Sequence, residues 1–146
     1  MKDHTRDYAT AAFAFYKQHN RSVKQFKNYI YKEALENYQK GDGTYGVSKP
    51  TEAAIVAAER ELEYYTAQIA DMEAVEKTIN ILEMTNGGSH IIKALEIVYL
   101  PGNFEKGEIE RRIHKAEIEI PAGTRTIYGW LKKARAYFAE ERGLRI

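Results

Sequence analysis

Residues 51–85 form the longest periodic stretch of the chain, and this stretch restricts the fold more than any other. Two series of apolar residues recur in it every seven positions, and the second series begins three positions after the first. They are Ile55, Leu62 and Ile69, and then Ala58, Tyr65, Met72 and Ile79. This spacing places both series along one side of an α-helix for about three heptads, so it predicts a long amphipathic helix.

The length of this predicted helix leaves three arrangements open. Unbroken, it would span about 52 Å at a rise of about 1.5 Å per residue, which is long for a compact domain of this size. We therefore expect the helix to dimerise, to bend between Asp71 and Glu76, or to serve as a spine for the other helices. Glu76 interrupts the first apolar series, which is why a bend is expected there. A core helix and a coiled coil fit the pattern equally well.

Two shorter amphipathic helices are predicted near the C-terminus. In the first, the apolar side carries Ile109, Ile113, Ala116 and Ile120, and in the second it carries Ile127, Leu131, Ala134 and Phe138. Pro121 disfavours helical geometry for the residue before it, so the first helix is expected to end there. Gly123 can cap the second helix and Gly143 can end it. A helix, a sharp break and a second helix predict a helix-turn-helix.

The outward side of the second helix is basic and supplies the candidate DNA contacts. A recognition helix enters the major groove with its N-terminal residues, so we expect Thr124 and Arg125 near base edges or the first phosphates. Arg125 can pair bidentately with guanine. Gly129 either permits close approach of DNA or is merely tolerated, and the two interpretations are equally good. The candidate set is Thr124, Arg125, Thr126, Tyr128, Gly129, Lys132, Lys133 and Arg135, with Arg111 and Lys115 on the first helix.

Within this set, different contacts are expected from different side chains. Tyr128, Lys132 and Arg135 are expected to position the phosphate backbone, and Arg111 and Lys115 to add phosphate contacts from the first helix. The charge distribution agrees with this expectation. The net charge is only +1, but residues 1–50 carry +4, residues 51–86 carry −6, residues 87–120 carry −1 and residues 121–146 carry +4. Positive charge concentrated at the second helix is typical of phosphate binding, although a solvated helix face can also be basic.

Other kinds of chemistry find little support in the sequence. The chain has no cysteine, which excludes disulfides and thiolate metal sites and favours an intracellular, cytoplasmic protein. Its four histidines show no metal-ligand spacing, and no phosphate-binding loop or nucleophile motif occurs. No run approaches the roughly 18 apolar residues of a membrane span. We therefore predict no catalytic residue, no metal, no cofactor and no membrane, and hence not an enzyme.

The remaining segments also carry helical spacing, so the predicted fold class is all-α. Residues 3–19 should form a helix that buries a broad face, with Tyr8, Ala12, Phe15 and His19 along one side and Phe13 and Tyr16 on a second apolar flank. The sequence GDGTYGVSKP at residues 41–50 marks a loop or hinge, and Asn86 precedes a second break. We predict a helical bundle with a long central helix. Its parts are a helical arm at residues 1–50, the central helix at 51–86 and a DNA-binding region at 87–146.

The C-terminal residues resemble a known family. The segment Gly123-Thr124-Arg125-Thr126-Ile127-Tyr128-Gly129-Trp130-Leu131-Lys132-Lys133-Ala134-Arg135 is similar to the recognition helix of sigma-70 region 4. In that family a small cap residue is followed by a Thr-plus-aliphatic pair and later by an Ala-Arg pair. The count from Ala116 to Gly123 is one step longer than that family's usual spacing, which implies a looser turn.

A wider resemblance covers small phage and prophage regulators of the ArpU and RinA kind. It is carried by Tyr8-Ala9-Thr10-Ala11-Ala12-Phe13, by Ser48-Lys49-Pro50-Thr51, by the Ile-rich helix ending at Tyr99 and by the Thr-Arg-Thr-Ile-Tyr segment of the second helix. Such proteins are thought to activate late or packaging genes by binding promoter DNA. The resemblance therefore implies double-stranded DNA as a partner, and RNA polymerase as a further one.

The expected function is that of a sequence-specific DNA-binding transcriptional regulator of phage or prophage origin, dimerising through residues 51–85. Two alternatives remain open. A DNA-packaging protein similar to a terminase small subunit also combines a helix-turn-helix with oligomerising helices, but it forms rings. A helical protein-interaction module would use the basic helix to bind an acidic partner. Oligomer size separates the first two functions, and salt-dependent duplex binding separates both from the third.

Overall fold

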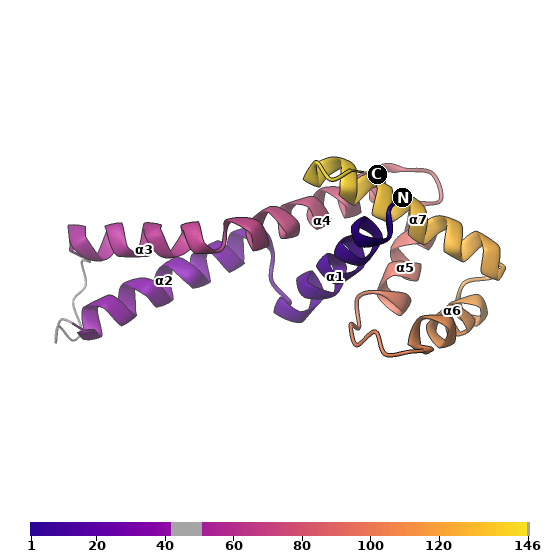
Figure 1. The fold of residues 1–146 in the computed structure, drawn as a ribbon, viewed down its shortest axis with the longest axis horizontal. Coiled ribbons are helices and arrows are strands. Elements are labelled where there is room, and N and C mark those ends of the chain that lie inside the picture. The colour runs from indigo at the N-terminus through magenta and orange to yellow at the C-terminus, as the bar shows by residue number, and fades with distance from the viewer. Residues whose placement is uncertain (42–50, 146) are drawn as a thin grey trace. The chain divides into compact units, whose positions relative to one another are not determined.

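The protein is all-helical, which confirms the predicted fold class. A computed structural model describes residues 1–41 and 51–145, and in these ranges the chain forms seven α-helices and no strand (Figure 1). The helices are α1 Asp3–His19, α2 Val23–Gly41, α3 Glu52–Tyr64, α4 Thr66–Met84, α5 Gly88–Val98, α6 Glu108–Glu119 and α7 Thr124–Arg142. None of these described helices is both long and apolar enough to cross a membrane.

The helices form two compact units. Unit 1 combines Met1–Asn20 with Asp71–Ile146, and unit 2 consists of Arg21–Ala70. The first helix, α1, thus belongs with the C-terminal helices, although a separate helical arm was predicted at residues 1–50. The predicted loop at 41–50 lies outside the described residues from residue 42 onward.

Unit 1 is built around one hydrophobic core to which α1, α4, α5, α6 and α7 all contribute. Among the described residues, the core comprises eighteen buried residues, which include Phe13 of α1. The ring centroid of Phe13 is 5.7 Å from that of Phe138 and 6.2 Å from that of Tyr99. The inward side of α1 is therefore centred on Phe13. Tyr8 and Phe15, which were expected to face the core, are exposed and half-buried.

Residues 51–85 form two helices and not one. Thr51 caps α3, because its hydroxyl accepts a hydrogen bond from the Ala54 amide at 3.1 Å. Tyr65 ends α3, and the hydroxyl of Thr66 then donates to the Glu63 carbonyl oxygen at 2.7 Å. The interruption therefore lies at Tyr65, upstream of the bend expected between residues 71 and 76. The heptad positions are buried at Ala58, Ile69 and Met72 and half-buried at Ile55, Leu62, Tyr65 and Ile79.

Unit 2 is a hairpin of α2 and α3 with the first residues of α4. Its first helix begins with a capping box: the Ser22 hydroxyl accepts from the Gln25 amide at 3.2 Å, and the Gln25 side chain accepts from the Ser22 amide at 3.0 Å. Phe26 of α2 packs edge-on against Tyr65, with ring centroids 5.9 Å apart. The N-terminal end of α2 is thus held by its own cap and by an aromatic contact.

A polar contact ties three helices of unit 1 together. The carboxylate of Asp71 on α4 accepts from the Tyr8 hydroxyl of α1 at 2.7 Å and from Nε of Arg142 on α7 at 2.7 Å. Partial burial and the hydrogen bond to Asp71 raise the pKa of the Tyr8 phenol, so Tyr8 stays a donor at neutral pH. The chain ends also meet here, because the Thr5 hydroxyl donates to the Arg145 carbonyl oxygen at 2.7 Å (Figure 1).

We predict that Asp71→Ala lowers the free energy of unfolding by about 1.5–3 kcal/mol, because it removes hydrogen bonds between a partly buried carboxylate and two donors. Urea denaturation followed by circular dichroism measures this change. The control is Glu83→Ala, which removes an exposed carboxylate from the same helix and should change stability by less than about 0.5 kcal/mol. Equal effects of the two substitutions would contradict the assigned role of Asp71.

Candidate nucleic-acid interface

The connection between α6 and α7 is short and is shaped by its own sequence. Only Ile120–Gly123 separates the two helices. Ile120, the residue before Pro121, has an extended backbone, as the proline ring requires. Gly123 is the N-cap of α7, and Gly143 ends this helix with a left-handed backbone at φ 72°. The start and end predicted for the second helix are confirmed.

The two sides of α7 differ as the spacing predicted. Ile127, Leu131, Ala134 and Phe138 are 0% exposed and belong to the core of unit 1. The opposite side is formed by seven exposed residues in the first half of the helix. They are Thr124, Arg125, Thr126, Tyr128, Gly129, Lys132 and Lys133. This exposed side is called the α7 outer face below.

The cationic side chains of the α7 outer face differ in whether they already have contacts within the chain. Within the part of the chain that the structure describes, Arg125 and Lys132 form no ion pair. The ammonium group of Lys133 lies 5.9 Å from the ring centroid of Tyr137. The hydroxyl of Thr124 donates to the Glu117 carboxylate, which links the first turn of α7 to α6. Arg125 and Lys132 are therefore the most accessible positive charges of this face.

Gly129 has no packing role within the chain. A methyl group placed on its α-carbon would meet, apart from its chain neighbours and the backbone of its own helix, no described atom within 4 Å. Its backbone is an ordinary helical one, because Gly129 is absent from the residues with positive φ. Neither a steric contact nor a special backbone conformation therefore requires glycine at this position.

Arg135 lies at the edge of the core and not on the α7 outer face. Its side chain is half-buried, and its guanidinium donates to the hydroxyl of Tyr99 at the end of α5. Its Nε is buried and has no acceptor among the residues that the structure describes. The contact joins α7 to α5, which gives Arg135 a packing role in addition to the phosphate contact expected from the sequence.

The candidate residues on α6 are exposed, but one of them is already paired. Arg111 donates to the Glu108 carboxylate through Nε at 3.2 Å and through a terminal nitrogen at 2.8 Å, whereas Lys115 is exposed. The hydrogen bond from Arg111 lowers the pKa of the Glu108 carboxyl below its usual 4.5. Because the folded-state pKa is depressed, this pair stabilises the fold above about pH 4.5, and its contribution is lost as the pH falls through the lowered value.

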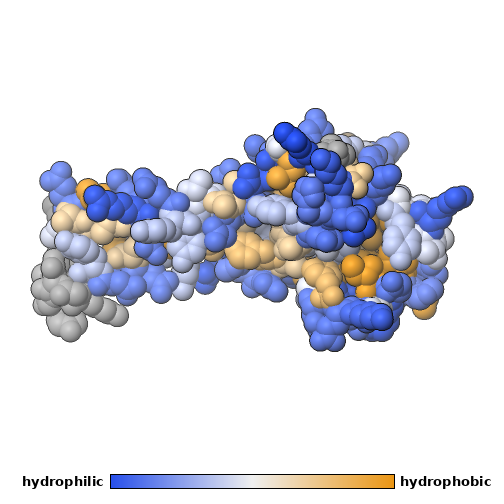
Figure 2. Space-filling view, viewed as in Figure 1, coloured by the Kyte–Doolittle hydropathy of each residue, from blue (hydrophilic) through white to orange (hydrophobic). Residues whose placement is uncertain are grey.

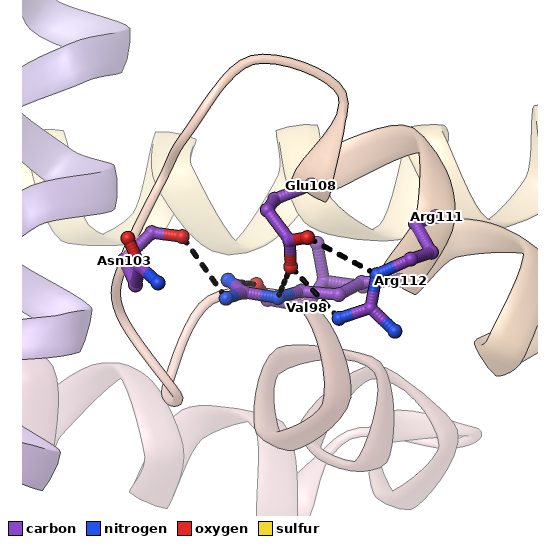
Figure 3. A network of polar contacts seen from close by, with 5 residues as sticks. All are labelled: Val98, Asn103, Glu108, Arg111 and Arg112. Carbon is purple, nitrogen blue, oxygen red and sulfur yellow. Dashed lines mark hydrogen bonds and ion pairs between the residues drawn. The ribbon is translucent and has the colours of Figure 1, made fainter.

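Arg112 is a buried structural residue of this region that was not among the predicted contacts. It is 7% exposed and donates to the carbonyl oxygens of Val98 at 3.1 Å and Asn103 at 3.0 Å (Figure 3). Its Nε lies 3.5 Å from the Glu108 carboxylate. Arg112 thus satisfies carbonyl groups where α5 ends and where the following loop turns, and it holds this loop against α6.

A weak signal for Arg112 was present in the sequence. It lies three residues after Ile109 and four before Ala116, so it shares the side of α6 that faces the core. A charged residue on an apolar side indicates a buried partner, but the partners here are backbone carbonyls, which carry no sequence signal.

Among the described residues, no group of three or more His, Cys, Asp or Glu side chains could hold a metal ion. Comparisons of the chain with family models, with curated proteins and with solved structures find no match. The resemblance to phage regulators therefore stays a prediction, and the geometry of α6 and α7 is what bears on function.

We predict that Arg112→Met lowers the free energy of unfolding by about 1.5–3 kcal/mol, because a charged donor to two carbonyls is lost. The matched control is Arg111→Met, which removes the exposed partner of the same carboxylate and should cost at most about 1 kcal/mol. Thermal and urea unfolding measure both values. If Arg111→Met costs as much as Arg112→Met, the assigned role of Arg112 is wrong.

Proposed function

We propose that the protein is a sequence-specific DNA-binding transcriptional regulator of the phage or prophage kind, in which α6 and α7 act as a helix-turn-helix. The observation that carries this proposal is the division of α7. Its apolar side is completely buried, while the first half of its other side presents Arg125, Lys132 and Lys133 to solvent. A recognition helix needs this combination of a rigidly held back and a basic, exposed N-terminal half.

The proposed contacts follow from positions on the α7 outer face. Arg125 lies in the first turn, where recognition helices reach base edges, and its planar guanidinium can pair with the O6 and N7 atoms of guanine. Lys132 and Lys133 lie two turns further along and bind phosphates, which position the helix without reading sequence. Tyr128 is 42% exposed and its hydroxyl can donate to a phosphate oxygen.

Two polar contacts refine the proposed interface. The Glu117 carboxylate holds the Thr124 hydroxyl, so this negative charge lies beside the first turn of α7. We propose that Glu117 orients Thr124 and opposes nonspecific phosphate binding near Arg125, since a carboxylate repels phosphate. Arg111 and Lys115 of α6 add phosphate contacts, and Arg111 exchanges Glu108 for phosphate when it does so. Arg135 acts mainly through its packing against Tyr99.

The assignment to a phage or prophage regulator rests on the resemblance of the C-terminal residues to sigma-70 region 4 and to the ArpU and RinA kind. On that resemblance we propose promoter DNA as the principal partner, RNA polymerase as a second one, the cytoplasm as the location, and no enzymatic activity. We also propose that the protein acts as a homodimer, because a twofold-symmetric regulator reads two half-sites of one duplex.

The proposal is tested by measuring duplex binding of Arg125→Ala and Lys132→Ala by fluorescence anisotropy, at several salt concentrations. Lys132→Ala should weaken binding to all sequences alike and reduce the dependence of log K on log salt by about 1. Arg125→Ala should cost about 1–3 kcal/mol on a selected site and relax the preference for guanine, as selection from a randomised duplex pool would show.

The control for both substitutions is Lys17→Ala, which removes an exposed cation from α1. It should leave affinity and salt dependence unchanged. If Arg125→Ala and Lys132→Ala also leave duplex affinity unchanged while the fold persists, α7 is not a DNA-reading helix. An eight- to twelve-membered ring in solution, the size that the resemblance to terminase small subunits implies, would favour the DNA-packaging function.

Substitution of Gly129 distinguishes the two interpretations of this residue, which are that it permits close approach of DNA or that glycine is merely tolerated there. Gly129→Ala should stabilise the fold by about 0.5–1 kcal/mol, because alanine favours a helix interior and the space around it is open. If the DNA backbone passes close to Gly129, the same substitution should weaken duplex binding although the fold is more stable. Higher stability with unchanged affinity would show that Gly129 is merely tolerated.

A further inference from the structure

The α2–α3 hairpin of unit 2 is antiparallel and leaves space between its helices. Phe26, near the start of α2, packs on Tyr65 at the end of α3, and Tyr38, near the end of α2, lines a pocket with Ala53 near the start of α3. Between these contacts a pocket of about 420 Å³ is lined by apolar and polar residues of both helices, which are Ile30, Glu33, Ala34, Asn37, Tyr38, Ala57, Glu61 and Tyr65. The pocket opens to solvent, so a partner can reach the residues that line it.

The core of the hairpin is also small. Among its described residues, the buried apolar side chains are Val23, Phe26, Ile30, Ala54, Ala58 and Ile69. Apolar groups remain at the surface, since Tyr29 is 44%, Val56 is 43% and Tyr64 is 80% exposed, and Figure 2 shows hydrophobic residues among the hydrophilic ones of the hairpin. Two helices of this length cannot cover one another's apolar sides, so the hairpin needs further helices to complete a core.

The net charges of α2 and α3 indicate which further helices can complete the core of the hairpin. The sequence of α2 contains four lysines and two glutamates, a net charge of +2. The sequence of α3 contains four glutamates and one arginine, a net charge of −3. A second hairpin of the same kind can therefore place its basic helix beside the acidic one and its acidic helix beside the basic one.

We propose that the space and the exposed apolar residues of the hairpin are covered by the hairpin of a second copy of this chain, forming a four-helix bundle. In this bundle α2 of each copy lies beside α3 of the other. A twofold axis parallel to the helices makes every neighbouring pair antiparallel and opposite in net charge, which is the geometry of up-and-down bundles. The arrangement with α2 beside α2 would place like charges together.

This symmetry also determines which residues of the two copies lie at the same height along the bundle axis. Rotation about an axis parallel to the helices does not change height along the bundle. Ala34 and Ala57 line the same pocket within one copy, so Ala34 of one copy lies level with Ala57 of the second. Small side chains at this level let larger neighbours enter the pocket, as knobs enter holes in helical bundles.

The inference rests on the dimeric state proposed above, but not on DNA binding. The proposed bundle also differs from a coiled coil formed by the heptad positions. Ile69 of the first heptad series and Ala58 of the second are already buried within the chain. The surface proposed here includes Ala53, Val56 and Ala57, which lie outside both heptad series.

The first test measures the mass of the full chain by light scattering coupled to size exclusion at micromolar concentrations. The wild type should have twice the chain mass of 16.8 kDa. Val56→Glu should have the mass of one chain with unchanged helicity, because Val56 is exposed in the single chain and a buried glutamate would disrupt the bundle. Ile118→Glu alters an equally branched side chain of unit 1 that is 86% exposed, and it should remain dimeric.

Three outcomes would overturn the proposal: a wild-type monomer, a ring, or a Val56→Glu chain that remains a dimer. The result is separable from DNA binding, because Arg125→Ala should remain dimeric whether or not it binds a duplex. Loss of DNA binding by an intact dimer bears on α7 alone, and loss of the dimer through Val56→Glu bears on unit 2.

The second test determines the arrangement of helices and also applies if Val56→Glu fails to fold. The chain has no cysteine, so Ala34→Cys and Ala57→Cys each introduce a single reactive group. The two variants are mixed and oxidised, with one of them tagged to distinguish the products. The proposed bundle predicts that disulfides between an Ala34→Cys chain and an Ala57→Cys chain predominate. An equal or greater yield of disulfides between identical chains would overturn it.

Discussion

The burial of one side of α7 is the constraint on which the rest of unit 1 depends. Ile127, Leu131, Ala134 and Phe138 are completely buried, and burying a large apolar side chain contributes about 1.5–3 kcal/mol. An exposed ion pair contributes at most about 1 kcal/mol, so the core and not the charges determines how α7 is rotated. Once this rotation is determined, the α7 outer face with Arg125 is the side of the helix that stays exposed to solvent.

Polar contacts then determine how the segments around this core are joined. Arg112 binds carbonyl groups at the end of α5 and in the loop before α6, and Asp71 joins side chains that lie 63 and 71 residues away. Such contacts add little net driving force, because each replaces hydrogen bonds to water. An arrangement of helices that lacked these contacts would leave buried polar groups without partners, which is costly. The contacts therefore favour one arrangement over others that bury a similar apolar area.

The two units differ in how completely they bury their apolar side chains. Unit 1 packs helices from both ends of the chain against the inner side of α7 and buries eighteen of the described residues in one core. Unit 2 has only the α2–α3 hairpin and the start of α4, and much of its apolar surface stays half-buried. A hairpin of two helices has few positions where a side chain can lose all contact with water, because small units bury a smaller fraction of their surface.

The sequence by itself determined the features that depend on neighbours along the chain. The inward residues of α6 and α7 follow from spacings of three and four, and the boundaries at Pro121, Gly123 and Gly143 follow from the backbone preferences of proline and glycine. Only the tertiary structure decided that α1 belongs with the C-terminal helices, that Arg112 and Arg135 turn toward carbonyl and hydroxyl oxygens, and that residues 51–85 are interrupted at Tyr65. The placement of α1 and the partners of Arg112 and Arg135 depend on groups brought together from distant parts of the chain, and periodicity along a single helix carries no information about such partners. The break at Tyr65 also contacts Phe26 of another helix, which the heptad spacing does not encode.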